Sequence, residues 1–218
     1  CSSDLKGLNM KRILSILLAS SFLACSAYAG GMIGVKVGTG TVDGTKTVDP
    51  SHGIGSNTTG SKDSEYAAIF LEANVSDRVS LGIEIVPLEG IVDSNAAARS
   101  DTQVTVRDLK TVYALVPFGD TPIYGKVGYG HADLSVVANY VTTTVGSASD
   151  SLEGPMVGIG AQFDSPIPFL DVIRVEGTYY KFDELSITTT NTTGTADTHT
   201  KKGDAELMTI SLSLAKSF

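Results

Sequence analysis

Residues 205–218 read AELMTISLSLAKSF and alternate regularly between apolar and polar side chains. Successive side chains of an extended strand point to opposite faces, so this alternation predicts a strand with one apolar and one polar face. The apolar face carries Met208, Ile210, Leu212, Leu214 and Phe218. The polar face carries Thr209, Ser211 and Ser213. Such a strand borders an apolar medium on one side only.

Seven further segments have a strand-like pattern, and they cover residues 32–39, 66–74, 79–86, 104–116, 123–137, 155–163 and 171–182. The facing of the segment 104–116 stays ambiguous. Short connections follow the second, fourth and sixth segments, while longer polar connections cover residues 40–62, 87–103, 139–154 and 183–204. Short turns at one end and long loops at the other are typical of outer-membrane barrels. The pattern predicts an all-β fold, an eight-stranded antiparallel up-and-down transmembrane β-barrel.

The charged residues of the polar faces indicate which face points into the barrel. Three basic and three acidic side chains lie at similar depth in their strands: Lys36, Glu72, Glu84, Lys126, Arg174 and Glu176. A Lys or Arg facing lipid at the bilayer midplane costs about 2–4 kcal/mol. An eight-stranded barrel is just wide enough for side chains to fill its interior. We therefore expect these six residues to face inward and form a structural charge network that plugs the lumen.

Aromatic residues gather near the predicted strand ends, where membrane barrels carry interfacial girdles. Near the short turns lie Phe118, Tyr124, Phe163, Phe169 and Phe218. Nearer the long loops lie Tyr66, Tyr140, Tyr180 and Phe182. A soluble lipocalin-type barrel, whose apolar face surrounds a ligand, is the main alternative fold. The aromatic placement and the inward charges favour the membrane barrel.

The segment 10–29 is predicted to be a secretory signal peptide. Lys11 and Arg12 precede the short apolar run 13–24, and Ala27-Tyr28-Ala29 offers small residues at the cleavage positions. The apolar run is shorter than the roughly 20 residues that a spanning helix needs. We expect residues 1–9 to be mis-called upstream leader. Lipid attachment at Cys25 is an alternative to cleavage after Ala29.

Cleavage after residue 29 would leave residues 30–218 as one outer-membrane β-barrel. Both cysteines, Cys1 and Cys25, would be lost, so no disulfide would support the fold. The leader contains three basic residues and one acid, so the remainder has 13 basic residues (16 − 3) and 23 acidic residues (24 − 1). The resulting net charge of −10 argues against nucleic-acid binding, which requires a basic surface.

Three segments resemble the OmpA-like small outer-membrane β-barrels, a porin-like group. They are PIYGKVGYG at 122–130, IRVEGTY at 173–179, and the terminal strand with Ile210, Leu212, Leu214 and Phe218. The resemblance implies an outer-membrane location, contact with membrane lipid and lipopolysaccharide, and a monomeric state. It also implies that the barrel-assembly machinery reads Phe218. Trp, frequent in the girdles of that group, is missing, and we expect this chain not to share the cell-wall-anchoring role of OmpA itself.

One strand offers residue types that could support hydrolysis. His131, Asp133 and Ser135 share a strand face, and a lipid-modifying enzyme would need such a combination of side chains. Residues two apart on a strand stand side by side about 7 Å apart, so a polar strand end is the favoured interpretation. We predict no enzymatic activity and no cofactor. We also predict no metal site, because the loop acids lack calcium-loop spacing: Asp43, Asp49, Asp63, Asp93, Asp101, Asp150 and Asp197.

The sequence leaves four functions open for a membrane barrel. The favoured one is a mainly structural or surface-interaction role with a plugged lumen. A small porin-like channel for small solutes and a loop-mediated adhesin are the alternatives. A lipid-modifying enzyme is the least favoured.

Overall fold

The structure, a computed structural model, describes residues 30–48, 58–87, 90–97, 100–140, 143–191 and 197–218. These residues form β-strands joined by turns, and no helix among them is long and apolar enough to span a membrane. The strands are β1 (Gly31–Val48), β2 (Thr58–Ser76), β3 (Val79–Val86), β4 (Gly90–Ala97), β5 (Ser100–Pro117), β6 (Ile123–Tyr140), β7 (Thr143–Asp164), β8 (Val172–Lys181), β9 (Leu185–Asn191) and β10 (Asp197–Ser217).

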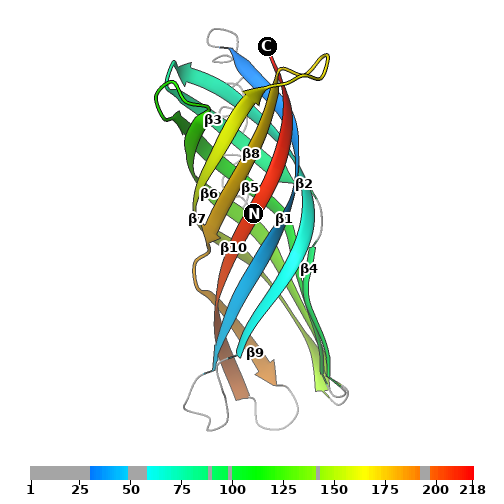
Figure 1. Ribbon diagram of the computed structural model, residues 1–218. Helices are drawn as coiled ribbons and strands as arrows, with labels where there is room; N and C mark the ends of the chain where they lie inside the picture. Colours follow the sequence, from blue (N-terminus) through cyan, green and yellow to red (C-terminus); the bar gives the residue numbers. More distant parts are fainter. Residues whose placement is uncertain (1–29, 49–57, 88–89, 98–99, 141–142, 192–196) are drawn as a thin grey trace, which may run out of the picture.

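The strands form one closed antiparallel barrel (Figure 1). Neighbours in sequence pair in a meander, and β1 pairs with β10 from Met32↔Ser217 to Val48↔Lys201, which closes the wall. Two of the strands in the barrel wall are interrupted. β4 continues the line of β3 along β5, and β9 continues the line of β8 along β10. The wall therefore has eight strands, which confirms the predicted fold class.

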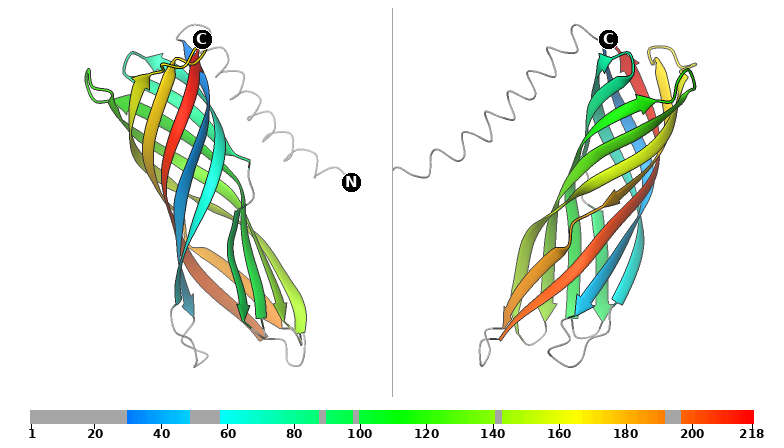
Figure 2. Two further views of the ribbon diagram at one scale, coloured as in Figure 1. Left: turned by 45° about the vertical axis from the view of Figure 1, so that its right-hand side comes forward. Right: turned by 90° about the vertical axis from the view of Figure 1, so that its left-hand side faces the viewer.

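The short turns lie together at one end of the barrel, beside the C-terminus (Figure 2). The turn at Asp77 and Arg78 joins β2 to β3, and residues 118–122 join β5 to β6. Residues 165–171 join β7 to β8, and the backbone N–H of Asp171 donates to the carbonyl of Ala215. The predicted alternation of connections is confirmed at this end.

The opposite end, called the loop side here, differs from the prediction. Segments expected to be polar loops are largely strand: β1 runs to Val48, and β7 starts at Thr143 rather than at residue 155. β5 pairs with β6 from Pro117↔Tyr124 up to Ser100↔Tyr140. These segments are rich in Thr, Ser and Val, and β-branched residues favour strands even where polarity suggests a loop.

Two breaks divide the barrel wall on the loop side. The ladder of β2 with β3 extends up to Ile69↔Ile85. The ladder of β7 with β8 extends up to Met156↔Tyr180, and one further backbone hydrogen bond joins the N–H of Asp183 to the carbonyl of Glu153. Beyond these contacts the described strands form two sets of four, β9-β10-β1-β2 and β4-β5-β6-β7, with no ladder between the sets. Pro87 follows β3 directly and lacks the N–H that a sheet ladder needs, which fits the first break.

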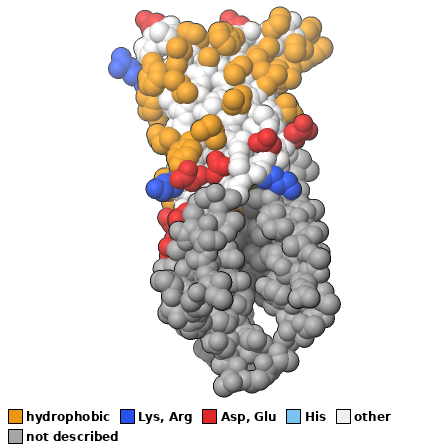
Figure 3. All heavy atoms as spheres, turned by 60° about the horizontal axis from the view of Figure 1, so that its bottom comes forward, with side chains coloured by type: hydrophobic (Ala, Val, Ile, Leu, Met, Phe, Trp, Pro, Cys, Tyr) orange, Lys and Arg blue, Asp and Glu red, His pale blue; other side chains and the backbone are white. Residues whose placement is uncertain are grey.

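The barrel is apolar outside and polar inside. Exposed apolar side chains include Ile33, Val35, Ile69, Val127, Val157, Ile159, Val175, Ile210 and Leu212. Buried polar side chains include Lys36, Glu84, Thr111, Lys126, Thr178, Thr209 and Ser211. The apolar belt covers the short-turn half of the outer face, and charged side chains lie along its border with the loop side (Figure 3). This polarity is the reverse of that in a soluble lipocalin-type barrel.

The structure settles the facing of the ambiguous segment 104–116 within β5. Thr111, Tyr113 and Leu115 are buried, while Val112 and Val116 are exposed. A bulge shifts the pairing of β5 with β6 between Arg107 and Lys110. Within this bulge Asp108 has a φ of 51°, a conformation in which Asp is tolerated better than most residues. The bulge breaks the alternation, which explains the ambiguity.

The prediction of two aromatic girdles is correct for only part of the residues. Phe118, Phe163, Phe169 and Phe218 are exposed near the short turns, as expected. Tyr124, Tyr180 and Phe182, by contrast, are buried in the lumen, and Tyr66 lies on the inner face of β2. Tyr140 has no described side chain. These inward aromatic residues lie an even number of positions from an inward-facing residue of the same strand, and such side chains share a face. Tyr124, for example, lies two residues from the buried Lys126.

Candidate functional site

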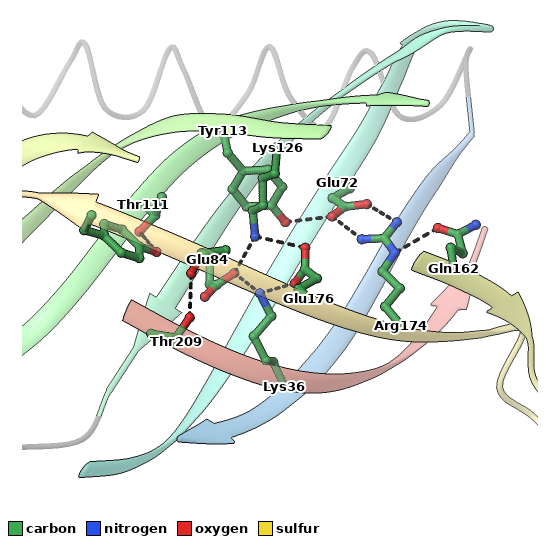
Figure 4. Close-up of polar contacts among 12 residues, drawn as sticks. Lys36, Glu72, Glu84, Thr111, Tyr113, Lys126, Gln162, Arg174, Glu176 and Thr209 are labelled. Atoms are coloured by element: carbon green, nitrogen blue, oxygen red, sulfur yellow. Dashed lines mark hydrogen bonds and ion pairs between the residues drawn. The ribbon is translucent and has the colours of Figure 1, made fainter. Parts of the chain in front are cut away.

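The centre of the lumen holds a square of two lysines and two glutamates (Figure 4). Lys36 Nζ lies 2.5 Å from Glu84 Oε2 and 2.5 Å from Glu176 Oε2. Lys126 Nζ lies 3.1 Å from Glu84 Oε2 and 3.3 Å from Glu176 Oε1. Each side chain comes from a different strand: β1, β3, β6 and β8. All four are at most 5% exposed, so each charge is compensated by two opposite charges rather than by water.

A second ion pair extends this square toward the short turns. The guanidinium of Arg174 donates to both oxygens of Glu72, at 2.5 Å and 2.7 Å. Its Nε donates to Gln162 Oε1 at 2.8 Å, and Tyr113 donates its hydroxyl to Glu72 Oε1 at 2.7 Å. Two-pronged contacts of this kind fix both partners in one geometry. The carboxylate of Glu72 is thus fully engaged.

Aromatic rings pack against the cations of this network. Lys126 Nζ lies 3.9 Å from the centre of the Tyr113 ring, and the guanidinium of Arg174 lies 5.5 Å from the Tyr124 ring. Phe70 approaches both Lys36 and Arg174, at 5.9 Å and 5.6 Å. Such contacts stabilise cations most where water is excluded. The rings also occupy cross-section that ions would otherwise need.

Glycines on the inner face make room for these large side chains. A Cβ on Gly82 would meet the Tyr113 ring, and a Cβ on Gly34 would meet the Phe70 ring. A Cβ on Gly160 would meet the ring of Tyr124. Each of these glycines is paired with its aromatic residue on the neighbouring strand, so the ring lies over the position where the glycine has no side chain.

Apolar side chains add to this filling. One buried cluster contains Tyr113, Leu115, Tyr124, Ala132, Leu152, Met156, Tyr180 and Phe182. The rings of Tyr180 and Phe182 stack at 5.8 Å, and the hydroxyls of Tyr180 and Thr111 lie 3.2 Å apart. A smaller cluster of Phe70, Val172 and Ala215 lies toward the short turns, where Met32 packs against it. Charged and apolar side chains together fill the described part of the lumen.

The structure brings together all six charged residues named from the sequence, and each is at most 4% exposed. Sequence reasoning missed the uncharged partners Tyr113, Gln162 and Phe70. The alternation of side chains along a strand could have predicted two of them. Phe70 lies two residues from Glu72 and Gln162 lies two residues from Gly160, so each faces the lumen with its neighbour. Tyr113 was hidden by the unresolved facing of its strand.

The hydrolytic residues considered from the sequence are arranged otherwise. His131 Nδ1 lies 2.9 Å from Glu153 Oε1, and His131 Nε2 lies 3.7 Å from Asp133 Oδ1. Both ring nitrogens lie beside carboxylates on the outer surface, and the side chain of Ser135 lies outside the described part of the structure. Among the described residues, no group of three His, Cys, Asp or Glu side chains could hold a metal ion.

Two further sequence predictions concern the ends of the chain. Phe218 is 59% exposed, and its backbone exchanges hydrogen bonds with Gly31, N–H to carbonyl in both directions. The terminal residue is thus held against β1 while its ring stays accessible. The predicted upstream leader 1–9 and signal peptide 10–29 lie outside the described residues.

Comparison with solved structures places this fold among outer-membrane barrels. The solid-state NMR structure of outer membrane protein AlkL in lipid bilayers matches with 14% identity, covering 87% of this chain and 90% of AlkL, at a TM-score of 0.53. OprG from Pseudomonas aeruginosa matches with 12% identity over 86% of this chain and 96% of its own, at a TM-score of 0.49. Ail of Yersinia pestis matches with 15% identity over 86% and 99%, at 0.45.

No protein-family model and no curated sequence matches the chain. The fold and the polarity of its surfaces define the class: a closed eight-stranded β-barrel of the bacterial outer-membrane type. Its apolar outer belt suits lipid, and the buried charges of its interior pair with one another.

Proposed function

We propose that this protein is a non-conducting outer-membrane barrel, of the OmpA-like kind, with a structural role in the envelope and a surface-interaction role at its loop side. The central ion-pair network carries the first part of the proposal. It joins opposite walls of the barrel through Lys36, Glu84, Lys126 and Glu176 at an exposure of 4% or less. A passing ion would have to break these contacts, and neighbouring apolar side chains fill the space beside them.

Electrical recording in planar bilayers tests the plug. The purified barrel, shown to be folded by a change in gel migration on boiling, should give no large, steady conductance. A stable open level of large conductance would favour the small porin-like channel instead. A barrel that migrates identically before and after boiling would contradict the membrane-barrel fold itself.

The length of the strands on the loop side supports the surface-interaction part. Continuous pairing carries β5 and β6 to Ser100 and Tyr140, and β1 and β10 to Val48 and Lys201, beyond the apolar belt. Ordered sheet beyond the membrane presents a fixed surface to the surroundings. This observation favours an adhesin-like contact as the second candidate function.

We also propose that the protein is not a lipid hydrolase and uses no cofactor. The exposure of His131, Asp133 and Glu153 supports this, because their side chains are 40%, 56% and 48% exposed rather than enclosed in a pocket. His131→Ala should leave membrane lipid chemistry unchanged in purified outer membranes. Loss of a lipid product in the variant would revive the enzyme hypothesis.

Export of residues 30–218 after removal of residues 10–29, and reading of Phe218 by the barrel-assembly machinery, complete the proposal. The exposed ring of Phe218 beside the closing pair of strands supports such recognition. Deleting Phe218 should lower the amount of folded barrel in the outer membrane while the purified variant still refolds in detergent. We propose a monomer surrounded by lipid and lipopolysaccharide.

A further inference from the structure

The loop-side part of β2 is a free sheet edge. β2 pairs with β1 along its whole loop-side length, down from Lys46↔Thr58. On its other side it pairs with β3 only from Ile69 to Ser76. β4 continues the β3 wall but pairs with β5 rather than β2, although some Cα atoms of β2 and β4 lie within 8 Å of each other. Among the described strands, residues 58–68 therefore have no hydrogen-bonded partner on that side, and their outward-directed backbone groups can accept another strand.

This edge lacks two of the usual devices that protect edges. The segment 58–68 contains no proline, and the one irregularity in the pairing of β2 lies at the other end, between Asn74 and Ser76. The segment carries charges instead: Lys62, Asp63 and Glu65, all exposed. Charges on an edge select partners by their own charge pattern.

The charge pattern of the edge disfavours pairing with a second copy of the chain. If two copies of β2 paired antiparallel about Ser64, Asp63 of each copy would lie opposite Glu65 of the other. Like charges directly opposite one another destabilise a strand pair. A partner with basic side chains at the same positions would instead form opposite-charge pairs.

The neighbouring surface reinforces this preference. Asp63 and Glu65 lie on the outward face of β2, and Asp43 lies on the same face of β1, opposite Glu206 of β10. Thr41 donates its hydroxyl to Asp63 Oδ1 at 2.6 Å, which orients that carboxylate. Four carboxylates on three adjacent strands thus give the outward face beside the edge a negative charge.

We propose that residues 58–68 form a docking site for an extended polypeptide segment that adds to β2 as a further strand. Backbone hydrogen bonds would give the attachment, and Lys or Arg at alternating positions would give the selectivity, opposite Asp63 and Glu65. The partner is a protein of the cell's surroundings that exposes such a basic, extended segment. This inference rests on the proposed surface-interaction role and specifies its site and chemistry.

The experiment uses the full barrel, folded in detergent micelles, and the synthetic peptide Thr-Lys-Val-Lys-Thr-Lys-Val. Calorimetry should detect binding, and a peptide with N-methyl groups on alternate backbone nitrogens should bind at least tenfold more weakly. Isotope-edited infrared spectra should show the bound peptide as a strand. Equal binding of the N-methylated peptide would overturn the proposal, because charge alone would then explain the affinity.

Two variants separate this edge from general electrostatics. Asp63→Asn with Glu65→Gln should weaken peptide binding about tenfold at low salt. The matched control, Asp77→Asn with Asp120→Asn, removes the same charge at the short-turn end and should leave binding unchanged. Equal losses in both variants would contradict the assigned site.

The outcome is distinguishable from a failure of the proposed function. A non-conducting barrel that binds no peptide would overturn the docking site and leave the plugged structural barrel standing. A conducting barrel that binds the peptide through β2 would do the opposite.

Discussion

Arg174 and Glu72 form a two-pronged ion pair in a place that water does not reach, since their side chains are 5% and 3% exposed. Such a pair contributes little net free energy when formed, because both charges lose their hydration. Removing one partner is different, since the other charge is then left buried without compensation. The six charges of the lumen sum to zero, so any single substitution breaks this balance.

Replacing Arg174 with Met should lower the free energy of unfolding by about 3–5 kcal/mol. The reason is the unpaired carboxylate of Glu72, which Tyr113 alone cannot compensate. Urea unfolding of the barrel in lipid vesicles measures the loss. The double variant Arg174→Met with Glu72→Gln should recover a large part of it, and strictly additive losses would contradict this account.

Gly82 tests how tightly the lumen is filled. A Cβ at this position would meet the ring of Tyr113, so Gly82→Ala should destabilise the barrel by about 1–3 kcal/mol. Gly60→Ala is the matched control, because a Cβ on Gly60 meets nothing within 4 Å. The same unfolding measurement applies. An unchanged stability of Gly82→Ala would mean that Tyr113 has room to move, which would weaken the plug.

The turn 165–171 is hydrogen-bonded to the end of β10. Asp171 accepts a hydrogen bond from Lys216 Nζ and another from the backbone N–H of Ser217, both at 2.8 Å. The hydrogen bond from Lys216 and that from Ser217 lower the pKa of the Asp171 carboxyl below its ordinary value. One carboxylate thus links the β7–β8 turn to the end of β10.

The stability that Asp171 contributes should depend on pH. Because the pKa is lower in the folded state, the contribution is complete above the unfolded pKa of about 3.9 and is lost as the pH falls through the folded pKa. Asp171→Asn should therefore be less stable than the wild type at pH 7, and the difference should shrink below pH 4. Urea midpoints at both pH values measure it, and a constant difference would exclude the charge as its cause.

The sequence predicted strands well where one face borders lipid and the other borders the lumen. There the alternation is strict, as in β10 and β3, and parity alone placed six charges on one inner surface. Beyond the apolar belt the sequence is polar on both faces of the sheet, so the period-two pattern vanishes. Polar segments with β-branched residues, such as β9, then resemble loops in sequence. The bulge at Asp108 hid the facing of β5, because a backbone irregularity leaves no apolar signature.

The apolar belt on the outer face and the ion-pair network in the lumen lie at the same level along the barrel axis. Lys126 points into the network, while its neighbour Val127 is 54% exposed on the outer face. The membrane therefore surrounds the part of the barrel that contains the ion-pair network. Exposed Phe163 marks the border of the belt at the short-turn end.

Charges placed on the outer face should reveal the position of the bilayer. Val127→Arg should make folding into lipid vesicles less favourable by about 2–4 kcal/mol, the value for a midplane position. Phe163→Arg should cost about 0–1 kcal/mol, because it lies near the interface. Refolding titrations in urea compare the two. Equal costs would contradict the placement of the belt.

The closure of the barrel by β1 and β10 joins residues that lie far apart in the sequence. Met32 pairs with Ser217, a separation of 185 residues along the chain (217 − 32). Forming contacts so distant in sequence is slow, because loop-closure entropy must be overcome before they contribute. Until the last strand arrives, β1 has no partner on one side and every partial sheet keeps two open borders. The unpaired edges of such a partial sheet favour aggregation until β10 pairs with β1 and closes the barrel.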